Sequence, residues 1–124
     1  MARILITEDE DSLRSFVARA LRMDGHDTVE AADGAEGLEA LADGKFDLLL
    51  SDIRMPVMDG IELTHKAAAA HPGLRILLMT GYAEQRERAD DLMEKIVDVV
   101  SKPFTLPDIR RPWPKHWRHS QRRA

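Results

Sequence analysis

One carboxylate stands at the end of an apolar run in the middle of the chain. Residues 46–52 read Phe-Asp-Leu-Leu-Leu-Ser-Asp, and a turn-forming stretch with Pro56 and the pair Asp59–Gly60 follows. A short apolar run bounded by turn signals is typical of a strand that is buried on both faces. Asp52 would then end a central strand, at the edge where open α/β sheets bind ligands. A buried carboxylate is costly unless other groups pair with it, so partners for Asp52 are expected elsewhere in the sequence.

Polar side chains that could pair with Asp52 follow three other apolar runs. Glu8 and Asp9 follow the first run of the chain, Thr80 follows the fourth and Lys102 follows the fifth. In a parallel sheet the carboxyl ends of all strands meet at one edge. These side chains are therefore expected to come together in space, although they span nearly the whole sequence.

The converging groups suit phosphoryl transfer assisted by a divalent cation. Three carboxylates close together repel one another, and a cation removes that repulsion. Mg²⁺ takes near-octahedral oxygen ligands, one or two of them carboxylates, and keeps several waters. Lys102 offers a positive charge for a phosphate oxygen, and Thr80 offers a hydroxyl donor. Asp52 can then act as a nucleophile toward phosphorus and form an acyl phosphate.

Five strand-like runs alternate with helical patterns and would position these groups. The strands are expected over residues 3–7, 27–31, 46–51, 75–79 and 97–100. The helices are expected from Ser12 to a stop at Gly25, around Leu38 and Leu41 to a stop near Gly44, over 60–70 before Pro72–Gly73, and over 83–96. This alternation predicts a parallel sheet with helices on both faces. Right-handed crossovers restrict it to a few doubly wound topologies.

Taken together, the motifs resemble those of response-regulator receiver domains. They are Glu8–Asp9, the segment Asp52-Ile53-Arg54-Met55-Pro56 with Asp59–Gly60, Thr80–Gly81 and Lys102-Pro103-Phe104. Each motif alone is weak, whereas the joint match is specific and covers residues 2–109. The resemblance implies a flavodoxin-like (βα)5 fold, a doubly wound parallel sheet with strand order 2-1-3-4-5, as in the chemotaxis receiver CheY.

The resemblance also implies which residues hold the phosphoryl group and the metal ion. Asp52 would accept the phosphoryl group and be a ligand of Mg²⁺. Asp9 would bind the ion directly and Glu8 through a water molecule. The backbone carbonyl of Arg54 would be a further ligand.

Two later positions complete the site that the resemblance implies. Thr80 and Lys102 would contact the phosphoryl group, and the peptide between Lys102 and Pro103 would be cis. Receivers couple movement of the threonine loop to an aromatic residue three positions before the lysine. That position is Val99 here, so aromatic flipping is not expected.

The function expected from the resemblance is that of a stand-alone receiver of two-component signalling. Among single-domain receivers the sequence is most similar to the CpdR type, which acts in regulated proteolysis. A histidine kinase or histidine phosphotransfer protein would phosphorylate the aspartate. The output would be contact with a downstream protein target through the fourth helix, fifth strand and fifth helix. Under this hypothesis the protein is not an enzyme.

Two alternatives draw on the same residues. A non-phosphorylated or degenerate binding module of the same fold would not need the complete site. An aspartyl-phosphate phosphohydrolase would also use Asp, Mg²⁺, Thr and Lys, and such enzymes carry an Asp-x-Asp motif at the first strand. The first strand here ends Thr7-Glu8-Asp9-Glu10, which does not match that motif.

Length and composition restrict the class of protein. The chain has 124 residues, which fits one domain, and no cysteine, which excludes disulfides and thiol chemistry. It has no run of 18 apolar residues, so no membrane span is expected. The N-terminus enters a strand-like pattern at once and has no signal-peptide layout, so a cytoplasmic protein is expected.

The C-terminal segment departs from the pattern of the rest of the chain. Residues 110–124 hold six basic residues and no acid, so they carry +6 and the remainder −10 within a net charge of −4. Pro112 and Pro114 interrupt the helix that would start near Thr105, and an interior proline costs roughly 3 kcal/mol. The fifth helix is therefore expected to be shortened or distorted. We divide the chain into a receiver domain, 1–109, and an atypical basic segment, 110–124.

Three interpretations of the basic segment are open. It binds an acidic partner or nucleic acid, it folds back on the acidic body, or it replaces an ordinary fifth helix. Replacement of an ordinary fifth helix is favoured, because the helical pattern ends abruptly after Arg111. A nucleic-acid partner is not expected. The oligomeric state is open between a monomer and a weak dimer, because a shortened helix would expose apolar surface that invites association.

The remaining candidate residues are expected to be structural. All five histidines, His26 among them, are expected to be solvated, and Asp59–Gly60 to form a turn or a helix cap. The alanines of residues 67–70 are expected to form helix surface that can pack closely. Glu10 and Asp11 are expected in a solvated acidic loop before a helix N-terminus, where acids are favourable.

Overall fold

The computed structural model describes residues 2–80, 96 and 98–101. Predictions that fall on other residues lie outside the described part of the chain. They concern the fourth and fifth helices, Lys102 with Pro103, and the segment 110–124.

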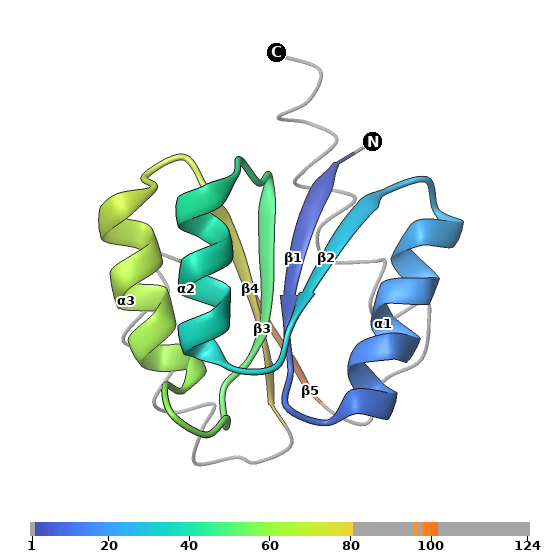
Figure 1. Ribbon diagram of the computed structural model, residues 1–124, viewed down its shortest axis with the longest axis horizontal. Helices are drawn as coiled ribbons and strands as arrows, with labels where there is room; N and C mark the ends of the chain where they lie inside the picture. The colour runs from blue at the N-terminus through green and yellow to red at the C-terminus, as the bar shows by residue number, and fades with distance from the viewer. Residues whose placement is uncertain (1, 81–95, 97, 102–124) are drawn as a thin grey trace.

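Strands and helices alternate along the described chain. The elements are β1 (Arg3–Thr7), α1 (Asp11–Met23), β2 (Asp27–Ala31), α2 (Gly34–Asp43), β3 (Leu48–Asp52), α3 (Gly60–Ala70), β4 (Arg75–Thr80) and β5 (Asp98–Ser101). The strands form one parallel sheet in the order β2-β1-β3-β4-β5 (Figure 1). The predicted doubly wound sheet and its strand order are confirmed. Strand β3 begins two residues later than predicted.

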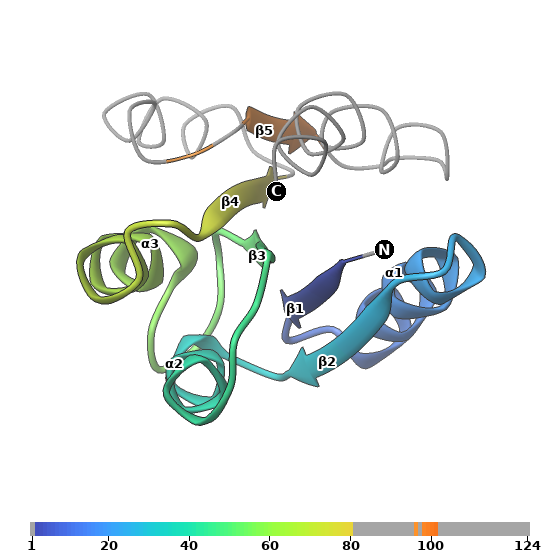
Figure 2. The same ribbon diagram turned by 90° about the horizontal axis from the view of Figure 1, so that it is seen from above.

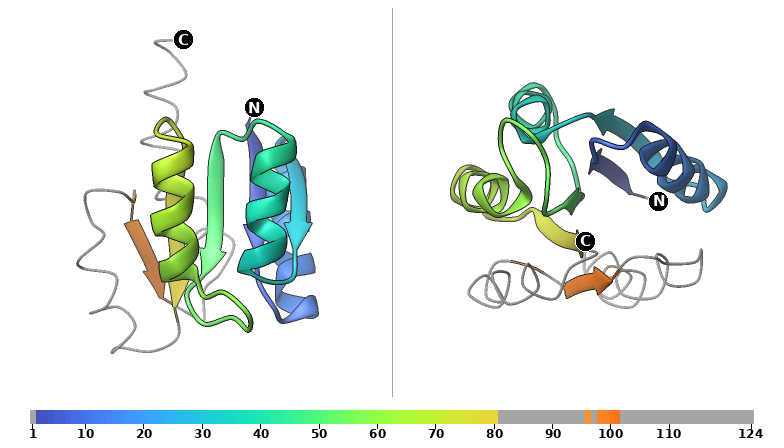
Figure 3. Two further views of the ribbon diagram at one scale, coloured as in Figure 1. Left: turned by 60° about the vertical axis from the view of Figure 1, so that its left-hand side comes forward. Right: turned by 90° about the horizontal axis from the view of Figure 1, so that it is seen from below.

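Helices cover both faces of the sheet and create two cores. Figure 2 shows α1 on one face and α2 with α3 on the other, and the views of Figure 3 show α2 and α3 side by side. Leu5 of β1 belongs to the core under α2 and α3, whereas Ile4 and Ile6 belong to the core under α1. Successive strand residues face opposite sides, so the central strands are apolar throughout because both sides are buried.

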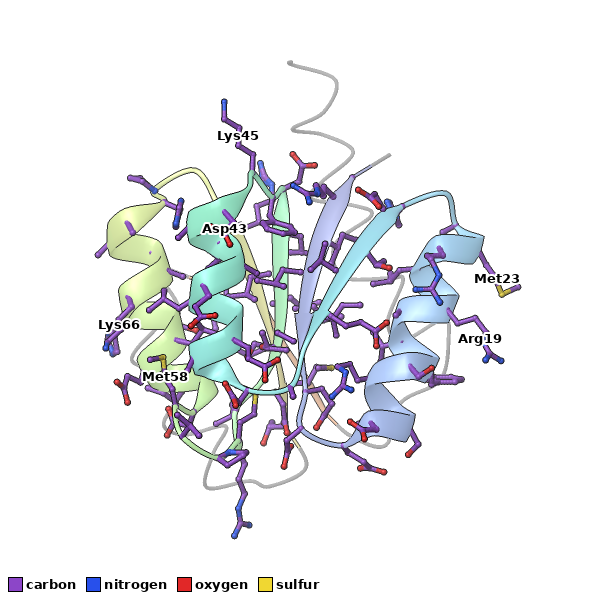
Figure 4. The ribbon with its side chains drawn as sticks, viewed as in Figure 1. Arg19, Met23, Asp43, Lys45, Met58 and Lys66 are labelled. Carbon is purple, nitrogen blue, oxygen red and sulfur yellow. The ribbon has the colours of Figure 1, made fainter. Side chains whose placement is uncertain are left out.

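Helix α1 has one buried face and one exposed face. Val17, Ala18 and Leu21 are buried against the sheet, whereas Arg19 and Met23 point away from it (Figure 4). The helix ends at Met23, and Gly25 follows its C-cap Asp24, as predicted for a residue that stops the helix. The φ of Gly25, 91°, lies in the region that glycine tolerates best.

Side chains cap the other two helices of the described chain. Asp33 accepts a hydrogen bond from the backbone N–H of Glu36, and Asp59 accepts one from Glu62, both at 2.9 Å. Each cap satisfies a donor that the first helical turn leaves unpaired. The predicted capping role of Asp59 is confirmed. None of the helices in the described chain is both long and apolar enough to span a bilayer.

One prediction about small residues is wrong. Ala67 is fully buried instead of lying on the helix surface. It stands four residues after the fully buried Leu63 and therefore shares the face of α3 that packs on the sheet. Ala69 and Ala70 are exposed, as the prediction for this segment requires.

The prediction that His26 is solvated is also wrong. Its ring is half-buried, and Nδ1 accepts a hydrogen bond from the backbone N–H of Ala2 at 3.1 Å. Burial lowers the pKa of His26 below its ordinary value. The charge of the amino terminus acts in the same direction, and Asp24 opposes it. Local sequence carries no signal for this contact because its partners are 24 residues apart.

We expect the free energy of unfolding to fall as the pH drops below about 6.5, the ordinary pKa of histidine. In that range the unfolded chain takes up a proton on His26 more readily than the folded chain, so protonation favours unfolding. Above that range this contribution to stability is fully present. Urea titrations from about pH 5 to pH 8 measure the slope.

The variant His26→Asn should show a flatter pH dependence, because an amide oxygen can replace Nδ1 as acceptor but does not titrate. His65→Asn, at an exposed position of α3, is the matched control and should keep the wild-type slope. Equal slopes in all three proteins would contradict the assignment to His26.

Candidate functional site

The carboxyl ends of the strands lie along one edge of the sheet, the lower edge in Figure 1. Strands β1, β3 and β4 end at Thr7, Asp52 and Thr80. Thr7 is in register with Ser51, and Thr80 with Ser101 of β5. The loops that follow β1 and β3 therefore start from paired strand ends.

Three of the predicted site residues meet at this edge. One carboxylate oxygen from each of Glu8, Asp9 and Asp52 lies within 4.8 Å of the others. Glu8 and Asp52 are 1% and 5% exposed, whereas Asp9 is exposed. The cluster is therefore open to solvent on the Asp9 side. Carboxylate oxygens are the ligands that Mg²⁺ prefers, and an open side lets the ion keep its waters, so the donor set fits this ion.

Hydrogen bonds hold Asp52 in place. Its Oδ1 accepts from the backbone N–H of Ile53 at 3.0 Å, and its carbonyl accepts from Ser51 Oγ at 2.8 Å. Thr7 Oγ1 in turn donates to Ser51 Oγ at 2.6 Å. Thr7 and Ser51 are fully buried, and they directly precede Glu8 and Asp52 in the sequence. No local sequence pattern indicates this hydroxyl pair, because only the register of β1 against β3 brings the two side chains together.

Glu8 is held by its backbone as well as by its side chain. Its N–H donates to the carbonyl of Ala31 at 3.1 Å, and its carbonyl accepts from Arg14 Nη1 at 2.8 Å. Its Oε2 accepts from the backbone N–H of Glu10 at 3.0 Å. These three hydrogen bonds fix the position of Glu8, the residue that precedes Asp9 in the loop between β1 and α1.

The start of α3 packs closely on the end of β3. A Cβ atom on Gly60 would overlap the carbonyl oxygen of Asp52 and lie 2.9 Å from Ile53 Cα. The N–H of Gly60 donates to the carbonyl of Ile53 at 2.7 Å. Only glycine allows such an approach, so Gly60 has a packing role beyond the predicted turn or cap.

The loop between β3 and α3 contains a strained residue. Val57 has a φ of 68°, and the N–H of Met58 donates to the carbonyl of Pro56 across it at 2.7 Å. This is the geometry of a γ-turn, and a β-branched residue in it costs on the order of 1–3 kcal/mol. The N–H of Gly34 donates to the carbonyl of Met58 at 3.2 Å and ties the loop to the start of α2.

The remaining predicted site residues are Thr80, Arg54 and Lys102. Thr80 is the last residue of β4, at the same edge as Asp52, and is 2% exposed. Arg54 lies two residues after Asp52 with an exposed side chain, and its carbonyl as a ligand stays a prediction. Lys102 lies outside the described residues and directly follows Ser101, the last residue of β5.

A parallel sheet of this order with an acidic cluster at its carboxyl edge defines a CheY-like receiver. The family model of the response regulator receiver domain matches residues 4–112. The chain belongs to that family and is a receiver of two-component signalling. Receiver domains are generally signalling modules that are not enzymes.

Individual relatives agree with this assignment. The chain is 40% identical over 109 residues to the response regulator receiver protein CpdR of Brucella abortus, covering 88% of this chain and 91% of that protein. This confirms the predicted similarity to CpdR-type receivers. A CheY-like receiver from Methanospirillum hungatei is 27% identical with a TM-score of 0.91, over 100% of this chain and 99% of that one.

A third relative shares the fold. The response regulator TrrA of Thermotoga maritima, solved in complex with Mg²⁺–BeF, is 24% identical with a TM-score of 0.78. The likeness covers 98% of both chains.

Proposed function

We propose that this chain is a stand-alone phospho-receiver in which Asp52 accepts a phosphoryl group in a Mg²⁺-dependent reaction. The observation that carries the proposal is the meeting of the Glu8, Asp9 and Asp52 carboxylates at the carboxyl edge of the sheet. Membership of the receiver family and the similarity to CpdR along 91% of that protein support it.

The proposed metal ligands come from two loops. Asp9 and Asp52 would bind Mg²⁺ directly, Glu8 would act through a water molecule, and the carbonyl of Arg54 would be a further ligand. When bound, the ion neutralises negative charge on the phosphoryl oxygens. Because Asp9 is exposed, a hydrated ion can reach its carboxylate from solvent. Glu8 is buried and is held in place by hydrogen bonds.

In the proposed reaction an oxygen of the Asp52 carboxylate attacks phosphorus and forms an acyl phosphate. The bond between phosphorus and the donor atom breaks, and the leaving group keeps the electron pair. The hydroxyl of Thr80 donates to one phosphoryl oxygen, and the ammonium of Lys102 pairs with another. The bond from the N–H of Ile53 orients the Asp52 carboxylate for this attack.

The proposed phosphodonor is a histidine kinase or a histidine phosphotransfer protein, and the proposed location is the cytoplasm. The phosphoryl group stays on the chain as a signal, so we propose no enzymatic turnover on a small substrate. A downstream protein target would distinguish the phosphorylated surface from the unphosphorylated one.

A Mg²⁺ titration followed by NMR tests the proposed site. Replacing Asp9 with alanine should weaken Mg²⁺ binding more than about tenfold, because a direct ligand is lost. The matched control is Asp43→Ala, which removes an equal charge from the end of α2 remote from the site (Figure 4) and should leave the affinity unchanged. Equal affinities of Asp9→Ala and Asp43→Ala would contradict the proposed metal site.

A further inference from the structure

Arg14 of α1 connects three elements beside the acidic cluster. Its side chain is only 16% exposed. Nη1 donates to the carbonyl of Glu8 at 2.8 Å, Nη2 lies 2.6 Å from Asp11 Oδ1, and Nε lies 3.4 Å from Glu30 Oε1. The guanidinium therefore joins the β1–α1 loop, the first turn of α1 and the strand β2.

The contact with Glu8 bears directly on Asp9. The carbonyl of Glu8 and the N–H of Asp9 belong to one planar peptide unit. A donor that fixes the direction of the Glu8 carbonyl therefore also fixes the orientation of the peptide plane that leads into Asp9. The N–H of Glu8 is bound to Ala31, so the backbone of Glu8 is held on both sides.

The acids around Arg14 hold the guanidinium in position. Asp11 contacts Nη2 and Glu30 contacts Nε, which leaves Nη1 directed at the carbonyl of Glu8. A guanidinium has planar donors in a fixed fork, so these contacts can be made together. Lysine, with a single nitrogen on a flexible stem, cannot reproduce this arrangement.

We propose that Arg14 is a positioning residue of the metal site. By fixing the peptide between Glu8 and Asp9, it holds the Asp9 carboxylate near Asp52 before the ion arrives. Preorganisation of this kind lowers the ordering cost of binding, and loss of groups that orient metal ligands typically weakens affinity 10–100-fold. The inference rests on the proposed function, because it assumes that the cluster binds Mg²⁺.

The decisive comparison is between Arg14→Gln and Arg22→Gln. Arg22 is also on α1 and also pairs with Glu30, at 3.9 Å, but its hydrogen bond goes to Thr28 and not to Glu8. Both variants lose one positive charge and one contact with Glu30. In Mg²⁺ titrations we expect about tenfold weaker binding for Arg14→Gln and a change of less than about twofold for Arg22→Gln.

A third variant separates positioning from charge. Arg14→Lys keeps the positive charge but loses the planar fork, so it should also bind Mg²⁺ several-fold more weakly than the wild type. Circular dichroism at the titration temperature establishes that each variant is folded. The amide NMR signal of Asp9 should shift in Arg14→Lys before any Mg²⁺ is added, and should not shift in Arg22→Gln.

The outcomes distinguish this inference from the function on which it rests. If Arg14→Gln and Arg14→Lys both bind Mg²⁺ as tightly as Arg22→Gln, the positioning role is wrong while the metal site stands. If Arg14→Lys binds Mg²⁺ like the wild type, the planar fork is not needed and the positioning role is likewise wrong. Tighter binding by Arg14→Gln would show that only the positive charge beside the cation site matters, which would also overturn the positioning role. If the wild type does not bind Mg²⁺, the proposed site fails and the inference fails with it.

Discussion

Replacing Asp52 with asparagine is expected to abolish phosphorylation of the chain by acetyl phosphate and Mg²⁺. A neutral amide oxygen is a poor nucleophile and leaves no stable acyl phosphate, so the loss should exceed about a thousandfold. The amount of phosphoprotein is measured by intact-protein mass spectrometry. The wild type should gain one phosphoryl group per chain, and chelation of Mg²⁺ should prevent the gain.

The Asp52→Asn variant should keep its fold, which makes the experiment specific. The side-chain oxygen of asparagine can still accept the bond that Ile53 N–H gives to Asp52 Oδ1, and the bond from Ser51 goes to the backbone carbonyl. A matched control is Asp59→Asn at the same edge, where asparagine is an equally good helix cap.

The control Asp59→Asn should be phosphorylated like the wild type. A phosphorylated Asp52→Asn variant would identify another acceptor and overturn the proposed role of Asp52. Beryllofluoride with Mg²⁺ gives a second measurement, because it should change the NMR spectrum of the wild type and not that of Asp52→Asn.

Replacing Gly60 with alanine is expected to cause the largest loss of stability among the variants considered. The added Cβ would overlap the carbonyl oxygen of Asp52, and both backbones are fixed by the bond from Gly60 N–H to Ile53. Overpacking against fixed backbone costs typically about 1–3 kcal/mol, and the rigid neighbours here place the cost at the upper end. We expect the Tm to fall by roughly 10 °C.

A second glycine provides the control for this loss. A Cβ at Gly73 would have no atom within 4 Å, and its φ lies outside the left-handed region. Gly73→Ala should therefore leave the Tm unchanged or raise it slightly, since alanine restricts the unfolded chain. Thermal unfolding followed by circular dichroism compares the two variants. Equal Tm values would show that α3 can shift away from β3 at little cost.

The site was predictable from sequence to the extent that strand ends determine it. The sequence places Glu8, Asp9 and Asp52 at one edge because they follow apolar runs, and parallel strands bring such positions together. The fold followed from the alternation of strand and helix patterns. The cap at Asp59 followed from a local preference, since a side chain can bond only to N–H groups a few residues away.

Other features depend on contacts between distant segments. Ala67 resembles its alanine neighbours in sequence, and only the orientation of α3 on the sheet decides which of them is buried. His26 is half-buried because Ala2 lies beside it. The sequence around Gly60 indicates only a turn or a helix cap, because its close approach to the end of β3 is a tertiary contact.

The sequence by itself thus determined the strands, their parallel arrangement and the identity of the converging carboxylates. These follow from hydrophobic periodicity and turn chemistry, which act over a few residues. Only the tertiary structure decided what holds the carboxylates in place. The bond from Thr7 to Ser51 and the contact of Arg14 with Glu8 and Glu30 require two elements in register. Such pairings depend on side-chain geometry across elements, which no local pattern in a single sequence specifies.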